Sequence, residues 1–246
     1  MNYKGGLAYQ AFQFAFVFVA VAMLGACNPD VFDVSVELAP HAYPADFGPS
    51  NGTIPVVACD ATMPSVCGTG QTLAVTTADG APADVSVAVG CDSGTARCFA
   101  EAHARLGYEL DVLQDDAFVT KVERRAISVV RTIDLAYTMP KNTLTFDVPR
   151  IDVYVGPAGS TLETDTGVAL VDSVSGIAAG TTFIDERRHL TLADASPART
   201  LIEQSIQAKT PFVFLVVTAP RLDAGKPLPG GAFELDVYPT VSLGLR

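Results

Sequence analysis

The sequence predicts an all-β protein, an antiparallel β-sandwich of the immunoglobulin-like or jelly-roll type with one short helix. Three observations lead to this prediction. Apolar and polar residues alternate with period two along many short segments, turn-forming residues separate these segments, and only one later segment has the signals of a helix. Many short strands joined by turns are typical of two packed antiparallel sheets.

The first 26 residues have the layout of a secretory signal peptide. Lys4 and the α-amino group supply positive charge, an apolar run from Phe14 to Met23 follows, and small residues come after it. A membrane-spanning helix needs roughly twenty apolar residues. The window 7–26 reaches that length, so an anchor helix remains the alternative interpretation of this segment.

The apolar segment ends in Leu24-Gly25-Ala26-Cys27, which resembles the lipobox of bacterial lipoprotein precursors. The resemblance implies that residues 1–26 are removed and that Cys27 becomes the mature N-terminus, acylated on its thiol. It also implies a membrane partner, because two or three acyl chains hold a protein firmly on a bilayer. Asn28 is not the aspartate that resembles an inner-membrane retention signal, which favours the outer membrane.

The charge of the chain bounds its partners. The net charge is −11, and loss of Lys4 with the signal peptide makes it −12. Adjacent cations occur only at Arg124-Arg125 and Arg187-Arg188. Nucleic acid and anionic headgroups are therefore poor partners by this count, since both need a basic footprint. We expect no nucleic-acid partner, no cofactor and no resident metal.

Because acylation would occupy the thiol of Cys27, an even number of cysteines is left: Cys59, Cys67, Cys91 and Cys98. In an exported chain such a set predicts two disulfides, and four cysteines allow three connectivities. We favour Cys59–Cys67 with Cys91–Cys98, because each bridge closes a small polar loop. A four-thiolate zinc site is the alternative, but its usual ligand spacing is shorter than the spacing here. The segment 54–98 could form a subdomain within a 27–246 domain.

Alternation defines the strands of the first half. Asn28-Pro29-Asp30 separates Cys27 from a strand at 31–38, and residues 40–53, rich in turn formers, are expected to form a loop. A hairpin follows, with strands at 73–77 and 85–89. The longest alternation, 97–111, predicts a strand with small and apolar residues on one face and charged residues on the other.

The second half continues this pattern and adds the helix. A strand at 127–139 is expected to turn at 140–143, and strands follow at 144–148, ending at Pro149, and at 151–155. Ser196 is a suitable N-cap and Pro197 a suitable first residue for a helix at 197–208. An apolar run predicts a buried strand at 212–217, and the last strand spans 233–243.

Two short motifs resemble protease sites. Asp92-Ser93-Gly94 matches the residues around a serine-protease nucleophile, with His41 as the base and Asp46 or Asp60 as the third member. The segment is too short for the barrels of such enzymes, so a cysteine-flanked loop is favoured. Asp165-Thr166-Gly167 matches the aspartic-protease triplet, but polar residues precede it, which favours a solvent-exposed loop.

Two further sets could serve acid–base chemistry or calcium binding. Glu101 and His103 share a strand face and could form a dyad, but the neighbouring charges indicate a solvated ladder. Asp111, Asp115 and Asp116 could hold calcium, but their spacing differs from that of a calcium-binding loop.

These observations predict a lipid-anchored protein of the cell envelope that acts as a non-catalytic binding or assembly module with an envelope protein partner. Sandwich edges and end loops offer contact surfaces without any catalytic set. An envelope hydrolase with an unrecognised site and a calcium-dependent adhesin are the alternatives.

Overall fold

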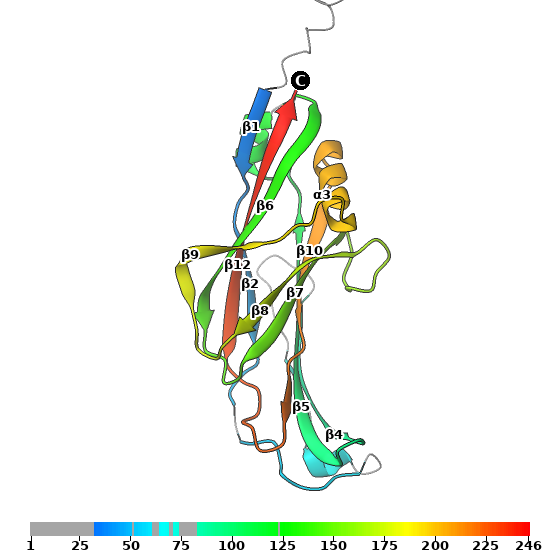
Figure 1. Ribbon diagram of the computed structural model, residues 1–246, viewed down its shortest axis with the longest axis vertical. Helices are drawn as coiled ribbons and strands as arrows, with labels where there is room; N and C mark the ends of the chain where they lie inside the picture. The colour runs from blue at the N-terminus through cyan, green and yellow to red at the C-terminus, as the bar shows by residue number, and fades with distance from the viewer. Residues whose placement is uncertain (1–31, 51, 61–63, 69–70, 74–82, 123) are drawn as a thin grey trace, which may run out of the picture.

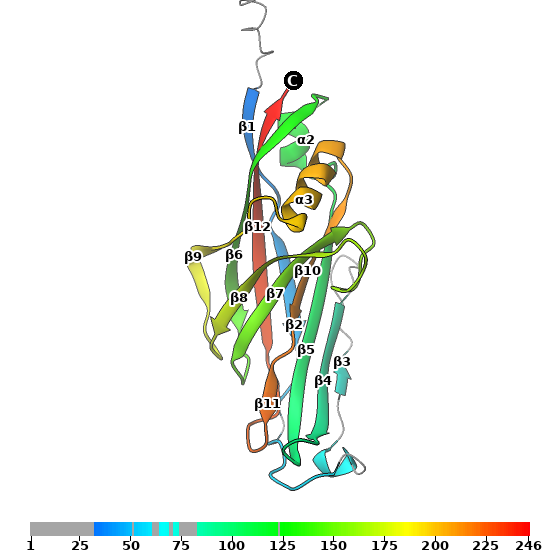
Figure 2. The same cartoon turned by 45° about the vertical axis from the view of Figure 1, so that its right-hand side comes forward.

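The computed structural model describes residues 32–50, 52–60, 64–68, 71–73, 83–122 and 124–246. They form antiparallel sheets in a sandwich-like arrangement (Figures 1 and 2), which confirms the predicted fold class. The predicted signal peptide, the lipobox-like segment with Cys27, and the predicted turn at 79–82 lie outside the described residues. Within the described part, neither α-helix combines the length and the apolar character needed to span a bilayer.

The first sheet has five strands built around β12, the last strand of the chain. Its order is β1-β12-β6-β9, and β2 pairs with β12 beyond the end of β1. Every pairing in this sheet is antiparallel. The strands are β1 (Phe32–Glu37), β2 (His41–Asp46), β6 (Ile127–Asn142), β9 (Phe183–Leu190) and β12 (Ala232–Leu245).

The second sheet has seven strands built around β5. Its order is β3-β4-β5-β10-β7-β8, and β11 pairs with β5 beyond the end of β10. Its strands are β3 (Gln71–Leu73), β4 (Ala83–Asp92), β5 (Arg97–Leu110), β7 (Val148–Pro157), β8 (Ala169–Ile177), β10 (Phe212–Thr218) and β11 (Arg221–Asp223). The predicted alternation of β5 is confirmed, because its even-numbered residues from Cys98 to Leu106 are buried and the odd-numbered residues between them are partly exposed.

The main core is formed by apolar side chains of both sheets, to which β10 contributes Phe212, Phe214 and Val216. Helix α3 (Pro197–Ala208) contributes Ile202 and Ile206 and lies against β6, β7 and β8. The predicted start of α3 is confirmed, since the Ser196 hydroxyl accepts a hydrogen bond from the Arg199 N–H at 3.1 Å.

The prediction of a loop over residues 40–53 was wrong in its first part, where β2 forms. Tyr43 and Ala45 of β2 are buried against the core, while Ala42, Pro44 and Asp46 are exposed. Pro44 is tolerated because β2 pairs only with β12 and is therefore an edge strand, where proline is accepted.

The predicted turn at 140–143 and the strand at 144–148 were also displaced. Strand β6 continues through Pro140 to Asn142, and the next strand, β7, begins at Val148. The Asn142 amide holds the following bend, because its Nδ2 donates to the Ala178 and Thr181 carbonyls and its Oδ1 accepts from the Leu144 N–H. Leu144 and Phe146 alternate because they are buried, not because they pair in a ladder.

The molecule is elongated, and its two ends differ (Figures 1 and 2). The first residues of β1, the last residues of β12, the first residues of β6 and helix α2 (Asp116–Val122) lie together at one end, which we call the β1 end. The turn between β4 and β5 and the short helix η1 (Pro64–Cys67) lie at the opposite end, which we call the disulfide end.

Candidate functional site

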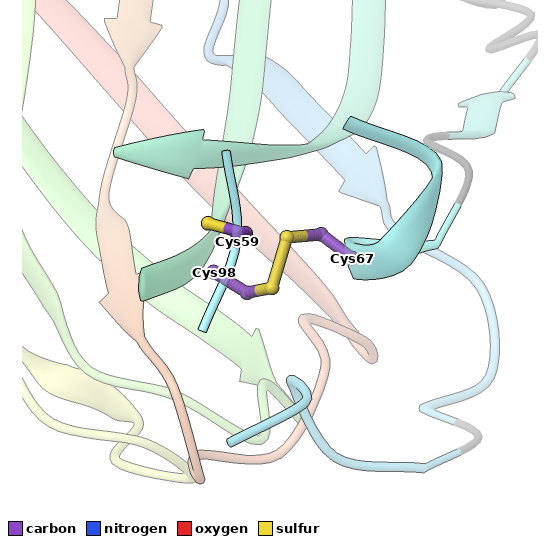
Figure 3. A group of neighbouring side chains, drawn as sticks. All are labelled: Cys59, Cys67 and Cys98. Atoms are coloured by element: carbon purple, nitrogen blue, oxygen red, sulfur yellow. A yellow bond between two sulfur atoms is a disulfide. The ribbon is translucent and has the colours of Figure 1, made fainter. Parts of the chain in front are cut away.

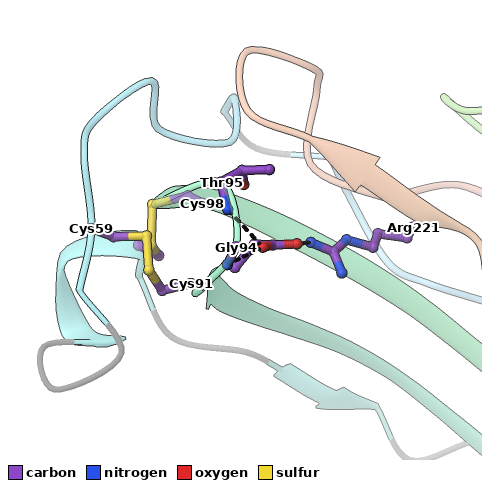
Figure 4. Close-up of a disulfide and its surroundings, with 8 residues drawn as sticks. Cys59, Cys91, Gly94, Thr95, Cys98 and Arg221 are labelled. Atoms are coloured by element: carbon purple, nitrogen blue, oxygen red, sulfur yellow. Dashed lines mark hydrogen bonds and ion pairs between the residues drawn. A yellow bond between two sulfur atoms is a disulfide. The ribbon is translucent and has the colours of Figure 1, made fainter.

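The disulfide end is held by two bridges that both start from the β4–β5 hairpin. Cys91 of β4 and Cys98 of β5 lie directly opposite each other in the ladder. Cys91 bonds to Cys59, and Cys98 bonds to Cys67 at the end of η1. The two bridges therefore fasten Cys59 and η1 onto one face of the hairpin end (Figures 3 and 4).

The prediction that all four cysteines form disulfides is confirmed, but the favoured connectivity was wrong. Each bridge joins cysteines 31 or 32 residues apart rather than the nearest neighbours in sequence. The reason is the register of the hairpin, which aligns Cys91 with Cys98. Each of them then bonds to a cysteine of the segment packed on that face rather than to its strand neighbour.

The positions and bonding of the cysteine sulfurs argue against the alternative of a zinc site. The sulfurs of Cys59, Cys67 and Cys98 lie within 4.8 Å of one another (Figure 3). Each of these sulfurs belongs to a disulfide, whereas a zinc ligand must be a free thiolate. The cysteine cluster therefore consists of disulfide cross-links in this structure.

A second, small apolar cluster lies beneath the bridges, where Ile54 and Ala100 are fully buried beside Cys67 and Cys98. Some apolar side chains at this end remain outside the cluster. Val56 is 73% exposed and Val66 is 46% exposed. The disulfide end is thus covalently fixed and exposes some apolar side chains to solvent.

The turn of the hairpin is fixed by Asp92 (Figure 4). One oxygen of the Asp92 carboxylate accepts hydrogen bonds from the N–H groups of Gly94 and Thr95, at 2.8 and 3.0 Å. The other oxygen pairs with the guanidinium of Arg221, which lies 4.0 Å from the centroid of the Phe99 ring. These hydrogen bonds, the one from Thr95 first, hold the pKa of Asp92 below its usual value.

This arrangement explains the match of Asp92-Ser93-Gly94 to a serine-protease motif as a turn. The His41 ring is stacked on the Tyr108 ring, with centroids 3.5 Å apart. Ser93 lies in the turn just before Arg97, the first residue of β5. Tyr108 lies eleven residues further along β5, which corresponds to about 35 Å at the rise of a strand. His41 and Ser93 therefore cannot form a catalytic pair.

The other protease-like triplet also has a local structural role. The Asp165 carboxylate accepts hydrogen bonds from the N–H groups of Thr161 and Leu162, at 2.9 and 3.0 Å. These two bonds hold the pKa of Asp165 below its usual value. The triplet closes a surface loop, as the sequence had indicated.

The charged face of β5 forms the predicted ladder. Arg105 donates from Nε and Nη2 to the two oxygens of Glu163, at 2.7 and 3.1 Å, and lies 3.7 Å from Asp84. His103 lies 3.8 Å from the same Asp84. Within the described residues, no hydrogen bond or ion pair joins Glu101 to His103, so the structure does not bring the proposed dyad together.

The aspartates considered for calcium lie around the start of α2, a helix that the sequence reading missed. Asp115 accepts hydrogen bonds from the N–H groups of Phe118 and Ala39, and so caps α2 and ties it to the chain after β1. Asp111 accepts from Leu113 and from the Gln114 amide. Of the described carboxylates, no three place their oxygens close enough together to share one ion.

Asp236 of β12 is an unusual acid that sequence reasoning missed. Its side chain lies on the outer face of the five-stranded sheet with Glu234 and Tyr238. Its carboxylate bonds to Tyr238, whereas Oδ1 is buried and finds no hydrogen-bond partner among the described residues. Burial, and then the charge of Glu234, raise the pKa of Asp236 above its usual value. The repeated acids at positions 234 and 236 of an alternating strand were the signal that could have found it.

Asp236→Asn is expected to stabilise the protein at neutral pH. A raised pKa in the folded state means that this state binds the proton more tightly, so stability falls as pH rises through the titration of Asp236. Removing the charge should therefore raise the free energy of unfolding at pH 7.

Urea unfolding of parent and variant, compared over a range of pH, checks this expectation. The gain should disappear in acid as Asp236 becomes protonated in both states. Asp134→Asn serves as the control, because the Asp134 carboxylate is exposed and has a partner. Its Oδ1 lies 2.8 Å from Nδ1 of His189. An Asp236→Asn variant less stable than the parent at pH 7 would show that the carboxylate makes a favourable contact.

Comparison with known proteins adds little to this description. No protein-family model matches the chain, and no curated protein matches it significantly. A chain in a solved structure of turnip yellow mosaic virus aligns over 89% of this chain and 96% of its own length, with 13% identity and a TM-score of 0.32. That score is too low to bear on fold or function.

Proposed function

We propose that this chain is an exported lipoprotein that is held on an envelope membrane by acylated Cys27 and acts as a non-catalytic binding or assembly module. The observation that carries the proposal is the pairing of the other four cysteines. Because Cys59 bonds to Cys91 and Cys67 to Cys98, Cys27 is the one cysteine left for lipid attachment.

The disulfides also support export. Such bonds persist in oxidising compartments outside the cytosol, which is where a signal peptide would deliver the chain. Strand β1 starts at Phe32, five residues after Cys27. At an extended length of about 3.5 Å per residue, the β1 end would lie within roughly 18 Å of the acylated residue. The disulfide end would then be the part of the domain farthest from the membrane.

A binding role accounts for the arrangement of the polar residues better than an enzymatic one. Asp92 and Asp165 cap turns, and Arg105 joins its strand to a loop through Glu163. The side chains that resembled catalytic groups thus hold the surface in shape. The exposed valines of the disulfide end supply the surface that we assign to an envelope protein partner, and Asn28 leads us to place the protein on the outer membrane.

Metabolic labelling with a fatty acid in the native host tests the anchor. The parent should incorporate the label, and Cys27→Ser should lose it completely and leave the membrane fraction. Asn28→Ser is the matched control, because it changes the neighbouring residue and keeps the thiol. Equal labelling of Cys27→Ser and parent would show that the acyl group is elsewhere, and membrane retention without label would favour the anchor-helix alternative.

A further inference from the structure

The β1 end carries a group of cations around one exposed aromatic ring. Lys121, Arg124, Arg125 and Arg246 are all exposed. Phe32 is 62% exposed, and the Arg125 guanidinium lies 5.8 Å from the centroid of its ring. We call these five residues the basic end.

The fold brings these residues together from three parts of the chain. Arg124 and Arg125 follow α2, and the next residue, Ala126, exchanges backbone hydrogen bonds with Arg246 at 3.3 and 2.9 Å. Leu245 pairs with Phe32 on one side and with Ile127 on the other. Counting adjacent cations along the sequence could not find this group.

The orientation of α2 places its acidic start away from the β1 end. At its start, Asp115 bonds to the Ala39 N–H, beyond the far end of β1. Near its end, Lys121 donates from Nζ to the Ser35 carbonyl at 2.7 Å. The acidic start of α2 therefore points away from the β1 end, and the basic residues that follow the helix lie at it.

The arginines at the tip are not paired with the acids of the described residues. The nearby Asp33 is paired with Arg131. In the part of the chain that the structure describes, no carboxylate forms an ion pair with Arg124, Arg125 or Arg246. The rest of this acidic domain would be repelled by an anionic bilayer. Such a bilayer would therefore attract the β1 end of the domain and repel the remainder.

We propose that the basic end rests on anionic phospholipid headgroups, with Phe32 at the level of the headgroups, and so holds the domain upright on its anchor. This inference rests on the proposed lipid attachment at Cys27, which lies only five residues before Phe32. Basic residues near a bilayer are drawn to anionic lipids over about a Debye length. The acyl chains supply the attachment, and the basic end sets the orientation that points the disulfide end away from the membrane.

A tryptophan reporter tests the orientation, because the natural sequence contains no tryptophan. Full-length Phe32→Trp protein is purified from membranes and reconstituted in vesicles of brominated phosphatidylcholine, with or without phosphatidylglycerol. Ile184→Trp is the matched control, since Ile184 of β9 is 61% exposed, as Phe32 is, but lies away from the β1 end. We expect bromolipid quenching of Phe32→Trp to be about twofold stronger with the anionic lipid and to weaken in high salt.

Charge variants separate the basic end from general electrostatics. Adding Arg124→Ser, Arg125→Ser and Arg246→Ser to the reporter should abolish the effect of the anionic lipid. The control removes three other exposed cations, by Arg97→Ser, Lys141→Ser and Lys226→Ser, and should preserve it.

The outcomes distinguish the two proposals. Acylated protein that floats with vesicles but shows the same Phe32→Trp quenching with both lipids overturns the headgroup contact and leaves the anchor intact. Loss of the effect in both triple variants overturns the assignment to the basic end. Protein that carries no acyl group and does not float overturns both the anchor and the inference built on it.

Discussion

Gly231→Ala is expected to lower the free energy of unfolding by about 3 kcal/mol, through backbone strain and steric overlap together. A Cβ at position 231 would lie 2.1 Å from the Thr143 carbonyl oxygen, and the backbone there has a φ of +88°. The atom it would meet belongs to the backbone, so no side chain can rotate away. Urea unfolding followed by circular dichroism measures the loss.

Three segments meet at this glycine, which is why the structure cannot easily adjust. The Gly231 N–H donates to the Gly48 carbonyl, and the Phe47 N–H donates to the Gly231 carbonyl. The neighbouring Ala232 carbonyl accepts from Thr143. Gly159→Ala is the matched control, because Gly159 has a φ of +81° and open space where its Cβ would be. A loss no greater than that of the control would show that the contact with Thr143 relaxes at little cost.

Replacing Cys67 and Cys98 together by alanine is expected to cost about 3 kcal/mol, the chain-entropy value for a loop of roughly 15 residues. The effective loop is this short because the remaining Cys59–Cys91 bridge already connects the two positions, from Cys67 back to Cys59 and from Cys91 on to Cys98. The bridge joins residues 31 apart in sequence, and its removal frees η1 from the hairpin. Small domains have roughly 5–15 kcal/mol of stability in total. We therefore expect a large fall in the urea midpoint, with loss of the small apolar cluster beneath the bridges.

Digestion before aspartate under non-reducing conditions checks the connectivity on which this expectation depends. Each of the four cysteines falls in its own peptide, because Asp60, Asp84 and Asp92 separate them. The structure requires the Cys59 peptide to be linked to the Cys91 peptide, and the Cys67 peptide to the Cys98 peptide. Links between the nearest cysteines instead would contradict it, and a double variant as stable as the parent would show that the bridge contributes nothing.

Features that depend on neighbouring residues could be predicted from the sequence. The alternation of β5 shows directly in the order of its side chains, and α3 begins with a capping serine and a proline. Helix α2 has only seven residues, and its start looked like an acidic cluster. Strand β9 is exposed along most of its length, so it has no alternation from which a strand could be recognised.

The properties of the candidate site depend on contacts between distant segments. The four cysteines were predicted as disulfide partners, but their pairing follows from the register of β4 against β5 and from the segment that covers Cys91 and Cys98. The basic end could not be predicted from the sequence for a similar reason. Arg246 and Arg125 become neighbours only through the pairing of β12 with β6. Residue types could be predicted, and their partners could not.

The central claim is that Cys27 carries the lipid that holds this sandwich on a membrane. Mass spectrometry of the N-terminal peptide of protein purified from its own host's membranes tests it most directly. The expected result is a peptide that begins at Cys27 and carries acyl groups. An unmodified Cys27 within a peptide that still continues to Leu24-Gly25-Ala26 would contradict the claim.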